Sequence, residues 1–433
     1  MSRSSRFRRE LRGRPDRKLV SVIMLFFFSA FLLIACRGEL HWQGFMLAAV
    51  VPLLIYIATM WLPRFFPADK LLLSIANFLC ALGVLVLYST DLIKGTNYGM
   101  QQAVYYGAGI LSMLFCILLV RYIRYWRVFI YIIAMCAVGL IVLPLLFGTE
   151  IYGATNWIII SGVSLQPSEI VKIALLLVLS YFMSQKRFWP WLVFSVLCMG
   201  VLMFQRDLGT ALIYYMTALL LYYASTGNLW ITGAGLLGGA GSAVFGYYEF
   251  AHVKRRIAVW HNPWMDFENT GYQIAQMLMA IASGGLLGVG LGLGAPTIIP
   301  VYHTDAIFAV ICEQFGIIFG VLVLVMYIIL ILRGAAIARS ARRSFHGLLA
   351  MGVTVMLALQ TFVIIGGVLK LIPLTGVTMP FVSYGGTSLV SCMGLIGLLQ
   401  GVSSVNQDDL TYDYEVSHSR IDEEELPFAD SDR

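Results

Sequence analysis

The chain has 433 residues, of which 59% are hydrophobic and only 12% are charged. Soluble globular domains carry about 25% charged residues, so this composition excludes a soluble globular protein. The formal net charge of +6 comes from basic residues in short segments between apolar runs. That pattern sets membrane topology and does not indicate a nucleic-acid partner. The seven cysteines lie in or beside apolar runs without any Cys-x-x-Cys pair, which predicts buried, unreactive thiols.

Residues 1–18 form a basic arm with eight Lys and Arg residues, which predicts a cytoplasmic N-terminus. The first apolar run lacks a small-residue cleavage site, so we interpret it as a retained helix and not as a signal peptide. The apolar runs are continuous, unlike the alternating strands of a barrel, and a helix of about 20 apolar residues spans a membrane. The chain is therefore predicted to be an all-α polytopic membrane protein. About twelve spans are expected, at residues 19–36, 45–62, 71–90, 104–120, 127–147, 168–184, 189–204, 208–225, 229–247, 307–332, 347–369 and 381–404.

The distribution of basic residues predicts the topology of these spans. Alternate threading from a cytoplasmic N-terminus places 19 of the 29 Lys and Arg residues on the cytoplasmic side, as expected for short cytoplasmic loops. The same threading places the loop 249–306 outside and the C-terminus inside. The acidic tail 405–433 has the composition of a disordered segment.

The loop 249–306 is the longest interval between strongly apolar runs, and Asp305 lies at its end, just before the next span. An acidic residue at the mouth of a membrane helix is costly without a partner or a function. Residues 273–282 are apolar and helical in pattern but too short to span, which predicts a re-entrant or interfacial helix. The glycine-rich run 283–294 is either a phosphate-binding loop or a flexible link, and the pattern leaves both open.

Several polar residues interrupt the apolar pattern. Glu169 and Lys172 are three residues apart and predict either a local ion pair or a substrate site. Asp207 is favoured as the N-cap of the helix that starts at Leu208. Glu313, inside a span, is a functional candidate because buried membrane carboxylates are expensive. A cluster on the outer half of the bundle favours an enzyme or receptor over a transporter, whose site lies near the midplane: Glu169, Lys172, Asp207, Arg255, Arg256, Asp305, Glu313, Ser383 and Tyr384.

Short motifs carry a resemblance to one family, and they run in that family's order. The motifs are, in chain order, Leu87-Tyr88-Ser89, Gly153-Ala154 with Trp157, Gln166-Pro167-Ser168-Glu169 with Lys172, Gln205 with Asp207-Leu208-Gly209-Thr210-Ala211, Arg256-Ile257, Gly271-Tyr272-Gln273, Ser283-Gly284-Gly285, Pro300 with His303-Thr304-Asp305, and Pro373-Leu374-Thr375-Gly376 through Pro380-Phe381-Val382-Ser383-Tyr384-Gly385-Gly386. Through this ordered set the chain resembles the shape, elongation, division and sporulation family, the FtsW/RodA/SpoVE proteins.

The resemblance implies a family core of ten helices at residues 71–404, preceded by an extra helix pair at residues 19–70. It also implies a peptidoglycan glycosyltransferase that polymerises lipid II at the outer face of the bacterial cytoplasmic membrane. The process would be cell division, elongation or sporulation, and the expected partner is a class B penicillin-binding protein. The essential aspartate of the family, at the end of the His-Thr-Asp motif, corresponds to Asp305.

This reaction needs a base that takes the proton from the acceptor hydroxyl, and Asp305 is the candidate, with its pKa raised by burial. The leaving pyrophosphate needs positive charge, which Arg255, Arg256 and Lys172 would supply. An α-linked donor and a β-1,4-linked product imply a single inverting displacement. Other substrate-binding candidates are Glu169, Gln205, Asp207, Glu313, Ser383 and Tyr384. No metal ligands are predicted, and the sequence leaves open whether a divalent cation takes part.

Four residues depart from the family pattern: Asn156 replaces an arginine, Arg206 a proline, Ala306 a phenylalanine and Gln314 a glutamate. None of these changes removes the proposed base. Two other functions remain as alternatives, a flippase or transporter of the lipid-linked precursor and a catalytically inactive scaffold for a penicillin-binding protein. Replacing Asp305 distinguishes them, because only the polymerase needs this carboxylate.

Overall fold

The computed structural model describes residues 17–37, 40–123, 125–151, 154–160, 163–267 and 271–424. Most of the basic arm (residues 1–16), Gly153 and the last part of the tail (residues 425–433) lie outside these ranges. The helices are α2 (Arg17–Ala35), α3 (Trp42–Tyr56), α4 (Lys70–Lys94), α5 (Tyr98–Tyr122), α6 (Trp126–Phe147), α7 (Pro167–Ser184), α8 (Phe188–Phe204), α9 (Leu208–Thr226), α10 (Leu229–Glu249), α11 (Ala251–His261), α12 (Tyr272–Gly284), α13 (Ile307–Ser340), α14 (Ser344–Val368) and α15 (Gly386–Glu424).

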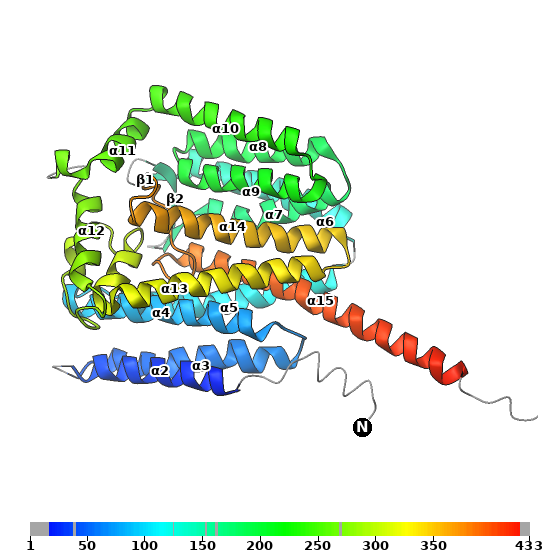
Figure 1. The fold of residues 1–433 in the computed structure, drawn as a ribbon, viewed down its shortest axis with the longest axis horizontal. Coiled ribbons are helices and arrows are strands. Elements are labelled where there is room, and N and C mark those ends of the chain that lie inside the picture. Colours follow the sequence, from blue (N-terminus) through cyan, green and yellow to red (C-terminus); the bar gives the residue numbers. More distant parts are fainter. Residues whose placement is uncertain are drawn as a thin grey trace, which may run out of the picture.

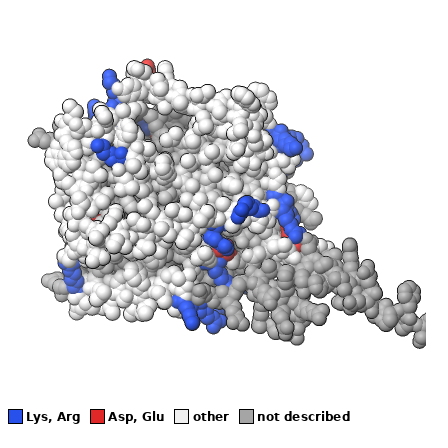
Figure 2. Space-filling model, in the orientation of Figure 1, with Lys and Arg blue, Asp and Glu red and all other residues white. Residues whose placement is uncertain are grey.

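The long helices form one bundle and run side by side (Figure 1). Within the described ranges, eleven helices are long and apolar enough to cross a membrane, and α8 is a shorter apolar helix of 17 residues. Figure 2 shows a central band almost free of charged side chains, with Lys and Arg side chains gathered at the two ends. The prediction of an all-α polytopic membrane protein with about twelve spans is confirmed.

Helix α4 is buried within the bundle, and all of its residues from Leu72 to Asp91 are buried. Asp69 caps its N-terminus by accepting a hydrogen bond from the Leu72 amide at 3.0 Å, and Gly95 ends it in the left-handed conformation, as helix ends require. The predicted N-terminal pair corresponds to α2 and α3, which pack on each other and on α4. This pair therefore extends the bundle at one edge (Figure 1).

Helices α11 and α12 lie within the predicted loop 249–306, at one end of the bundle. Figure 1 shows α12 running across the ends of the long helices and not along them. This orientation agrees with the prediction of a short helix at residues 273–282 and favours the interfacial form over a re-entrant one. We call this part of the molecule the α12 end.

Two features of the fold differ from the sequence analysis. A three-stranded antiparallel sheet between α6 and α7 was not predicted; it comprises β1 (Thr149–Ile151), β2 (Ala154–Ile160) and β3 (Val163–Leu165). The tail was predicted to be disordered from residue 405, whereas α15 continues as a helix to Glu424. The described start of the tail is tied to the bundle by an ion pair of 2.8 Å between Arg121 Nη2 and Asp408 Oδ2.

The glycine-rich run packs against a kink in α13, and neither predicted role describes it. Gly316 breaks the helix with a φ of 83°, and the Ile317 amide donates to the Gly285 carbonyl oxygen at 2.9 Å. The Gly290 amide likewise donates to the Gln314 carbonyl oxygen at 3.0 Å. A Cβ atom added at Gly288 would lie 2.3 Å from the Gln314 oxygen. These glycines therefore allow the backbones of the run and of α13 to approach closely. The run is not a free link, and it does not line the cavity of the candidate site, so it does not serve as a phosphate-binding loop there.

We expect Gly288→Ala to destabilise the protein by more than about 3 kcal/mol, because backbone must move and the residue has positive φ. Gly95→Ala is the matched control: its φ is also positive, but no atom lies within 4 Å of the added Cβ. Its expected cost is only about 1 kcal/mol. Thermal unfolding of the two variants in detergent measures the difference, and equal unfolding temperatures would refute the close approach.

Candidate functional site

A cavity of about 520 Å³ opens at the α12 end of the bundle, which is within the size range of ligand pockets. Its walls come from β2, the first turns of α7, α9 and α12, helix α11, and the segments 301–305, 374–378 and 384–385. Six of the predicted site residues line it: Glu169, Asp207, Arg255, Arg256, Asp305 and Tyr384. Four others do not: Lys172, Gln205, Glu313 and Ser383.

The segment that carries Asp305 is held from behind by the segment that follows α14. The Ser383 hydroxyl donates to the Thr304 carbonyl oxygen at 2.6 Å, and the Tyr384 amide donates to the His303 carbonyl oxygen at 2.8 Å. Ser383 also accepts from the Met379 amide at 2.8 Å. Ser383 is buried behind the cavity wall, so its contacts position Asp305 and leave it no direct access to a ligand.

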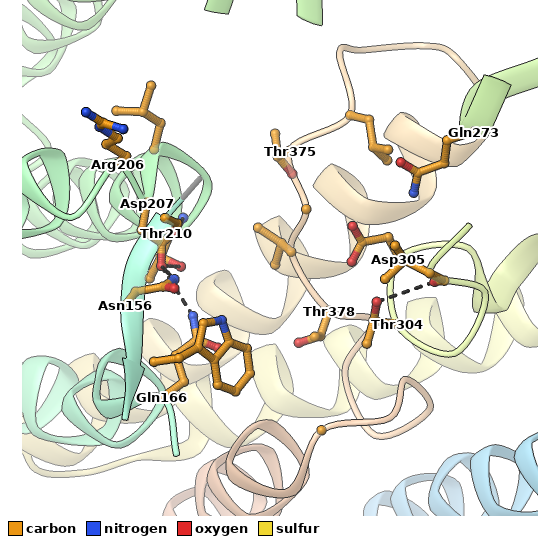
Figure 3. A pocket seen from close by; sticks show the side chains of 18 of the residues that line it. Asn156, Gln166, Arg206, Asp207, Thr210, Gln273, Thr304, Asp305, Thr375 and Thr378 are labelled. Carbon is orange, nitrogen blue, oxygen red and sulfur yellow. Dashed lines mark hydrogen bonds between the residues drawn. The ribbon is translucent and has the colours of Figure 1, made fainter. Parts of the chain in front are cut away.

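The Asp305 carboxylate faces the cavity (Figure 3). Burial raises the pKa of this carboxyl to about 6, although a hydrogen bond from Thr304 and the positive charge of Arg256 oppose the rise. Such a group is ionised at neutral pH yet basic enough to take a proton, as a general base requires. This position lies just before α13, at the edge of the apolar region.

His303 also lines the cavity, but it does not add positive charge there. Its ring stacks on Tyr98 with 4.6 Å between the ring centroids. Burial, and to a smaller extent the charge of Lys94, lowers the pKa of His303 to about 4, so its imidazole is neutral at neutral pH.

The positive charge at the cavity comes from α11 and from Arg206. Arg255 and Arg256 are exposed and lie on the wall, and Arg256 Nη1 donates to the Thr375 carbonyl oxygen at 3.1 Å. This bond ties α11 to the segment 374–378. Arg206, which was predicted only as a departure from the family pattern, also lines the cavity.

Lys172 lies behind the cavity and forms a buried ion pair with Glu169. Lys172 Nζ donates to Glu169 Oε2 at 2.6 Å and to Gln360 Oε1 at 3.0 Å. The Ser391 hydroxyl donates to the same Glu169 oxygen at 2.8 Å. Lys172 and Glu169 are only 2% and 4% exposed, so Lys172 is fully engaged, and the prediction that it contacts pyrophosphate directly does not fit this geometry.

Asp207 organises the wall opposite Asp305 (Figure 3). Its carboxylate accepts from the Thr210 amide at 3.1 Å, which is the predicted N-cap bond, and from the Thr210 hydroxyl at 2.9 Å. Asn156 Nδ2 and Gln166 Nε2 donate to it at 2.8 and 3.3 Å. Asp207 therefore joins β2, α7 and α9. Gln205 is buried nearby and donates to the Ile141 carbonyl oxygen at 2.6 Å, which is a structural contact.

We expect Asp207→Ala to lower the free energy of unfolding by about 1–2 kcal/mol, because it removes an N-cap and leaves two amide groups without their acceptor. Asp207→Asn is the comparison, since it keeps an oxygen for the Thr210 amide. Thermal unfolding in detergent measures the effect. We expect the lowest unfolding temperature for Asp207→Ala, an intermediate one for Asp207→Asn and the highest for the wild type. If Asp207→Ala unfolded at the same temperature as the wild type, Asp207 would not hold β2, α7 and α9 together.

Glu313 points away from the cavity and does not line it, so its predicted role as a substrate-binding residue does not fit the structure. Its Oε1 accepts from the Ala295 amide at 2.9 Å, at the end of the glycine-rich run. The neighbouring Gln314 accepts from the Ser89 hydroxyl at 2.9 Å. Although Glu313 follows Asp305 by two helical turns, Asp305 precedes the helix, so the spacing does not place them on one helical face.

The cavity also contains polar residues that were not predicted as site residues: Asn156, Gln166, Thr210, Gln273, Thr304, Thr375 and Thr378 (Figure 3). Most of them lie within the motifs that carry the family resemblance, and that clustering is the signal that could have identified them. In the described part of the chain, no group of three or more His, Cys, Asp or Glu side chains could hold a metal ion.

The fold and this site define a multi-pass membrane protein with a polar cavity at one end of its bundle. The profile of the cell cycle protein family FtsW/RodA/SpoVE matches residues 69–408, and the chain belongs to this family. It is 32% identical to the peptidoglycan glycosyltransferase RodA of Mycobacterium tuberculosis over 427 residues, covering 90% of this chain and 91% of the relative. It is 33% identical to a probable peptidoglycan glycosyltransferase FtsW of Geobacter metallireducens, covering 78% and 94%.

Sporulation and shape proteins are similar to the chain as well. It is 32% identical to stage V sporulation protein E of Bacillus subtilis, covering 77% of this chain and 96% of the relative. The crystal structure of RodA from Thermus thermophilus has a TM-score of 0.57 at 25% identity, covering 79% and 98%. A chain from a structure of a peptidoglycan synthase complex has a TM-score of 0.66 at 26% identity, covering 78% and 98%. The chain is thus an enzyme of the glycosyltransferase class.

Proposed function

We propose that this chain is a peptidoglycan glycosyltransferase that polymerises lipid II into a β-1,4-linked glycan, with Asp305 as the general base. The observation that carries this proposal is the Asp305 carboxylate, with a pKa of about 6, facing a cavity that also contains Arg255 and Arg256. A base and a cationic surface in one cavity are what glycosyl transfer from a lipid pyrophosphate requires.

In the proposed step, the acceptor hydroxyl oxygen attacks the anomeric carbon of the donor sugar while its proton moves to Asp305. The bond between the anomeric carbon and the pyrophosphate oxygen breaks, and the leaving group keeps the electron pair. Arg255 and Arg256 stabilise the negative charge that develops on the pyrophosphate. One displacement converts the α-linked donor into a β-linked product, so a second catalytic carboxylate is not needed.

Glu169 and Lys172 enter this proposal as a support for the cavity wall. Their buried pair fixes the first turns of α7, where Glu169 reaches the wall and Gln166 meets Asp207. Asp207 and Tyr384 line the cavity as candidates for substrate contacts. Gln205 and Ser383 act one layer behind, by positioning β2 and the Asp305 segment.

We place the cavity at the outer face of the bacterial cytoplasmic membrane, with both termini in the cytoplasm. The connections at the opposite end carry Lys186, Arg187, Arg342 and Arg343, as expected for cytoplasmic loops. The cavity walls come from the α12 end, which favours an enzyme over a transporter with a site at the midplane.

A class B penicillin-binding protein is the proposed partner, because one similar chain was solved within a peptidoglycan synthase complex described as coordinating polymerization and crosslinking. Relatives named RodA, FtsW and stage V sporulation protein E all match this chain at similar identity, so the proposal covers peptidoglycan synthesis without choosing among cell division, elongation and sporulation. The proposal includes no nucleic-acid partner.

The role of α11 is tested by Arg255→Ala combined with Arg256→Ala. We expect this variant to lower kcat/KM for lipid II by about 10²–10³-fold, because an electrostatic contact to the leaving group is lost. Polymer formation from purified lipid II measures the effect. Lys254→Ala is the control, since Lys254 is exposed on the same helix and does not line the cavity. Unchanged kinetics in the double variant would remove the arginines from the mechanism.

A further inference from the structure

Four buried polar atoms of residues that line the cavity have no hydrogen-bond partner within the described part of the chain. They are Asn156 Oδ1, Gln273 Nε2, His303 Nδ1 and Thr375 Oγ1. Buried polar atoms in native proteins nearly always have a partner. Nine other unpaired buried atoms lie elsewhere in the described chain, so a bound ligand is indicated only by the gathering of these four around one cavity.

Two of these residues, Gln273 and Thr375, line the same cavity as Asp305. Figure 3 shows the Gln273 amide on one side of the Asp305 carboxylate and Thr375 on another, with all three turned toward the same space. Thr375 precedes Gly376, whose added Cβ would lie 3.6 Å from Asp305 Oδ2. The hydrogen bond from Arg256 to the Thr375 carbonyl oxygen holds this segment in place, while the Thr375 hydroxyl stays unpaired.

The chemistry of this pair differs from that of α11. Gln273 Nε2 is a neutral donor, and the Thr375 hydroxyl can donate and accept. Neutral groups of this kind suit the hydroxyl and acetamido groups of a sugar, whereas pyrophosphate is better matched by the guanidinium groups of Arg255 and Arg256. Gln273 is the second residue of α12, so the helix fixes its position relative to the cavity.

We propose that Gln273 and Thr375 form the acceptor-sugar subsite, which holds the sugar whose hydroxyl Asp305 deprotonates. This assignment rests on the proposed function of Asp305. Gln273 donates to an oxygen of the N-acetylated sugar, and Thr375 hydrogen-bonds a neighbouring hydroxyl or acetamido group. Both act as positioning residues, because they orient the acceptor hydroxyl toward the carboxylate and exchange no proton with it.

The test compares two inhibitors of polymer formation from purified lipid II. One is the free disaccharide N-acetylglucosaminyl-N-acetylmuramic acid, which carries neither lipid nor pyrophosphate; the other is inorganic pyrophosphate. We expect Gln273→Leu and Thr375→Val each to weaken inhibition by the disaccharide about five- to tenfold, as for the loss of one hydrogen bond. Inhibition by pyrophosphate stays unchanged in both variants.

Three controls separate this role from a structural one. Thr375→Ser keeps the hydroxyl and restores inhibition by the disaccharide. Gln276→Leu, on the same helix but outside the cavity wall, behaves as the wild type. The unfolding temperature of each variant shows whether it is folded, and Gln273→Asn replaces Gln273→Leu if the leucine variant does not fold.

Three results would overturn the subsite. The variants could weaken inhibition by the disaccharide and by pyrophosphate equally, both variants could leave inhibition by the disaccharide unchanged, or the disaccharide could fail to inhibit the wild type. Failure of the proposed function gives a different result. In that case Asp305→Ala would still form polymer, whatever the inhibitors do.

Discussion

Replacing Asp305 by asparagine is expected to abolish polymer formation from purified lipid II. The change keeps the size and polarity of the side chain but removes the base, and a positioned general base contributes about 10²–10⁴-fold to a rate. The segment should keep its place, since it is held through the Thr304 and His303 carbonyl oxygens and not through the carboxylate. The variant should therefore fold and bind lipid II while failing to extend it.

Two comparisons make this result specific. Glu249→Gln removes an exposed carboxylate at the end of α10, away from the cavity, and should leave the rate unchanged. Asp305→Ala, purified in the same way, shows whether residual polymer comes from a contaminating enzyme. Normal rates in Asp305→Asn would exclude the carboxylate as the base. Absence of polymer from the wild type as well would favour the flippase and scaffold hypotheses instead.

Lys172→Met is expected to cause a large loss of stability, about 3–5 kcal/mol, because it leaves a buried carboxylate without its partner. The methionine fills a similar volume, so the effect reports charge and not packing. In the wild type, Lys172 Nζ donates to both Glu169 and Gln360, and the variant breaks both bonds at once. Thermal unfolding in detergent measures the change.

The double variant Lys172→Met with Glu169→Gln is the matched control. It removes the unpaired charge, so most of the lost stability should return. If Glu169 shapes the cavity wall, the double variant should still polymerise lipid II more slowly than the wild type. A double variant as unstable as Lys172→Met alone would mean that packing, and not the ion pair, holds this part of α7.

The helices of this fold were predictable because each apolar run is long and uninterrupted. The hydrocarbon of the membrane imposes that pattern on every spanning helix, and α13 or α14 is recognisable from it alone. The sheet was not predicted because its strands are short; β1 and β3 have three residues each. The β-branched run Ile158-Ile159-Ile160, with Val163 after a two-residue gap, was the available hairpin signal.

The candidate site was only partly predictable. Polar residues at helix ends stand out against apolar sequence, which is why Glu169, Asp207 and Asp305 were selected, and the structure brings all three to one cavity. The spacing of Glu169 and Lys172 predicted an ion pair or a substrate site but could not decide between them, and the sequence could not show that Glu313 turns toward the glycine-rich run. Both outcomes depend on which helices surround α7 and α13, and that information is not local.

The glycine-rich run illustrates the same limit. Glycine permits both a phosphate-binding loop and a close contact between two backbones, and the sequence contains no feature that separates them. The kink at Gly316, nearly thirty residues beyond Gly288, decides the outcome, because the run fits against the carbonyl groups that this kink exposes.

The pH dependence of polymer formation tests the central claim about Asp305 most directly. Initial rates from purified lipid II would be measured for the wild type between about pH 5 and 8, at substrate concentrations low enough to report kcat/KM of the free enzyme. A general base works only when deprotonated, so the rate should be constant above the pKa of about 6. It should fall about tenfold per pH unit below that value. A rate that is flat down to pH 5, or one that rises as the pH falls, would contradict Asp305 as the base.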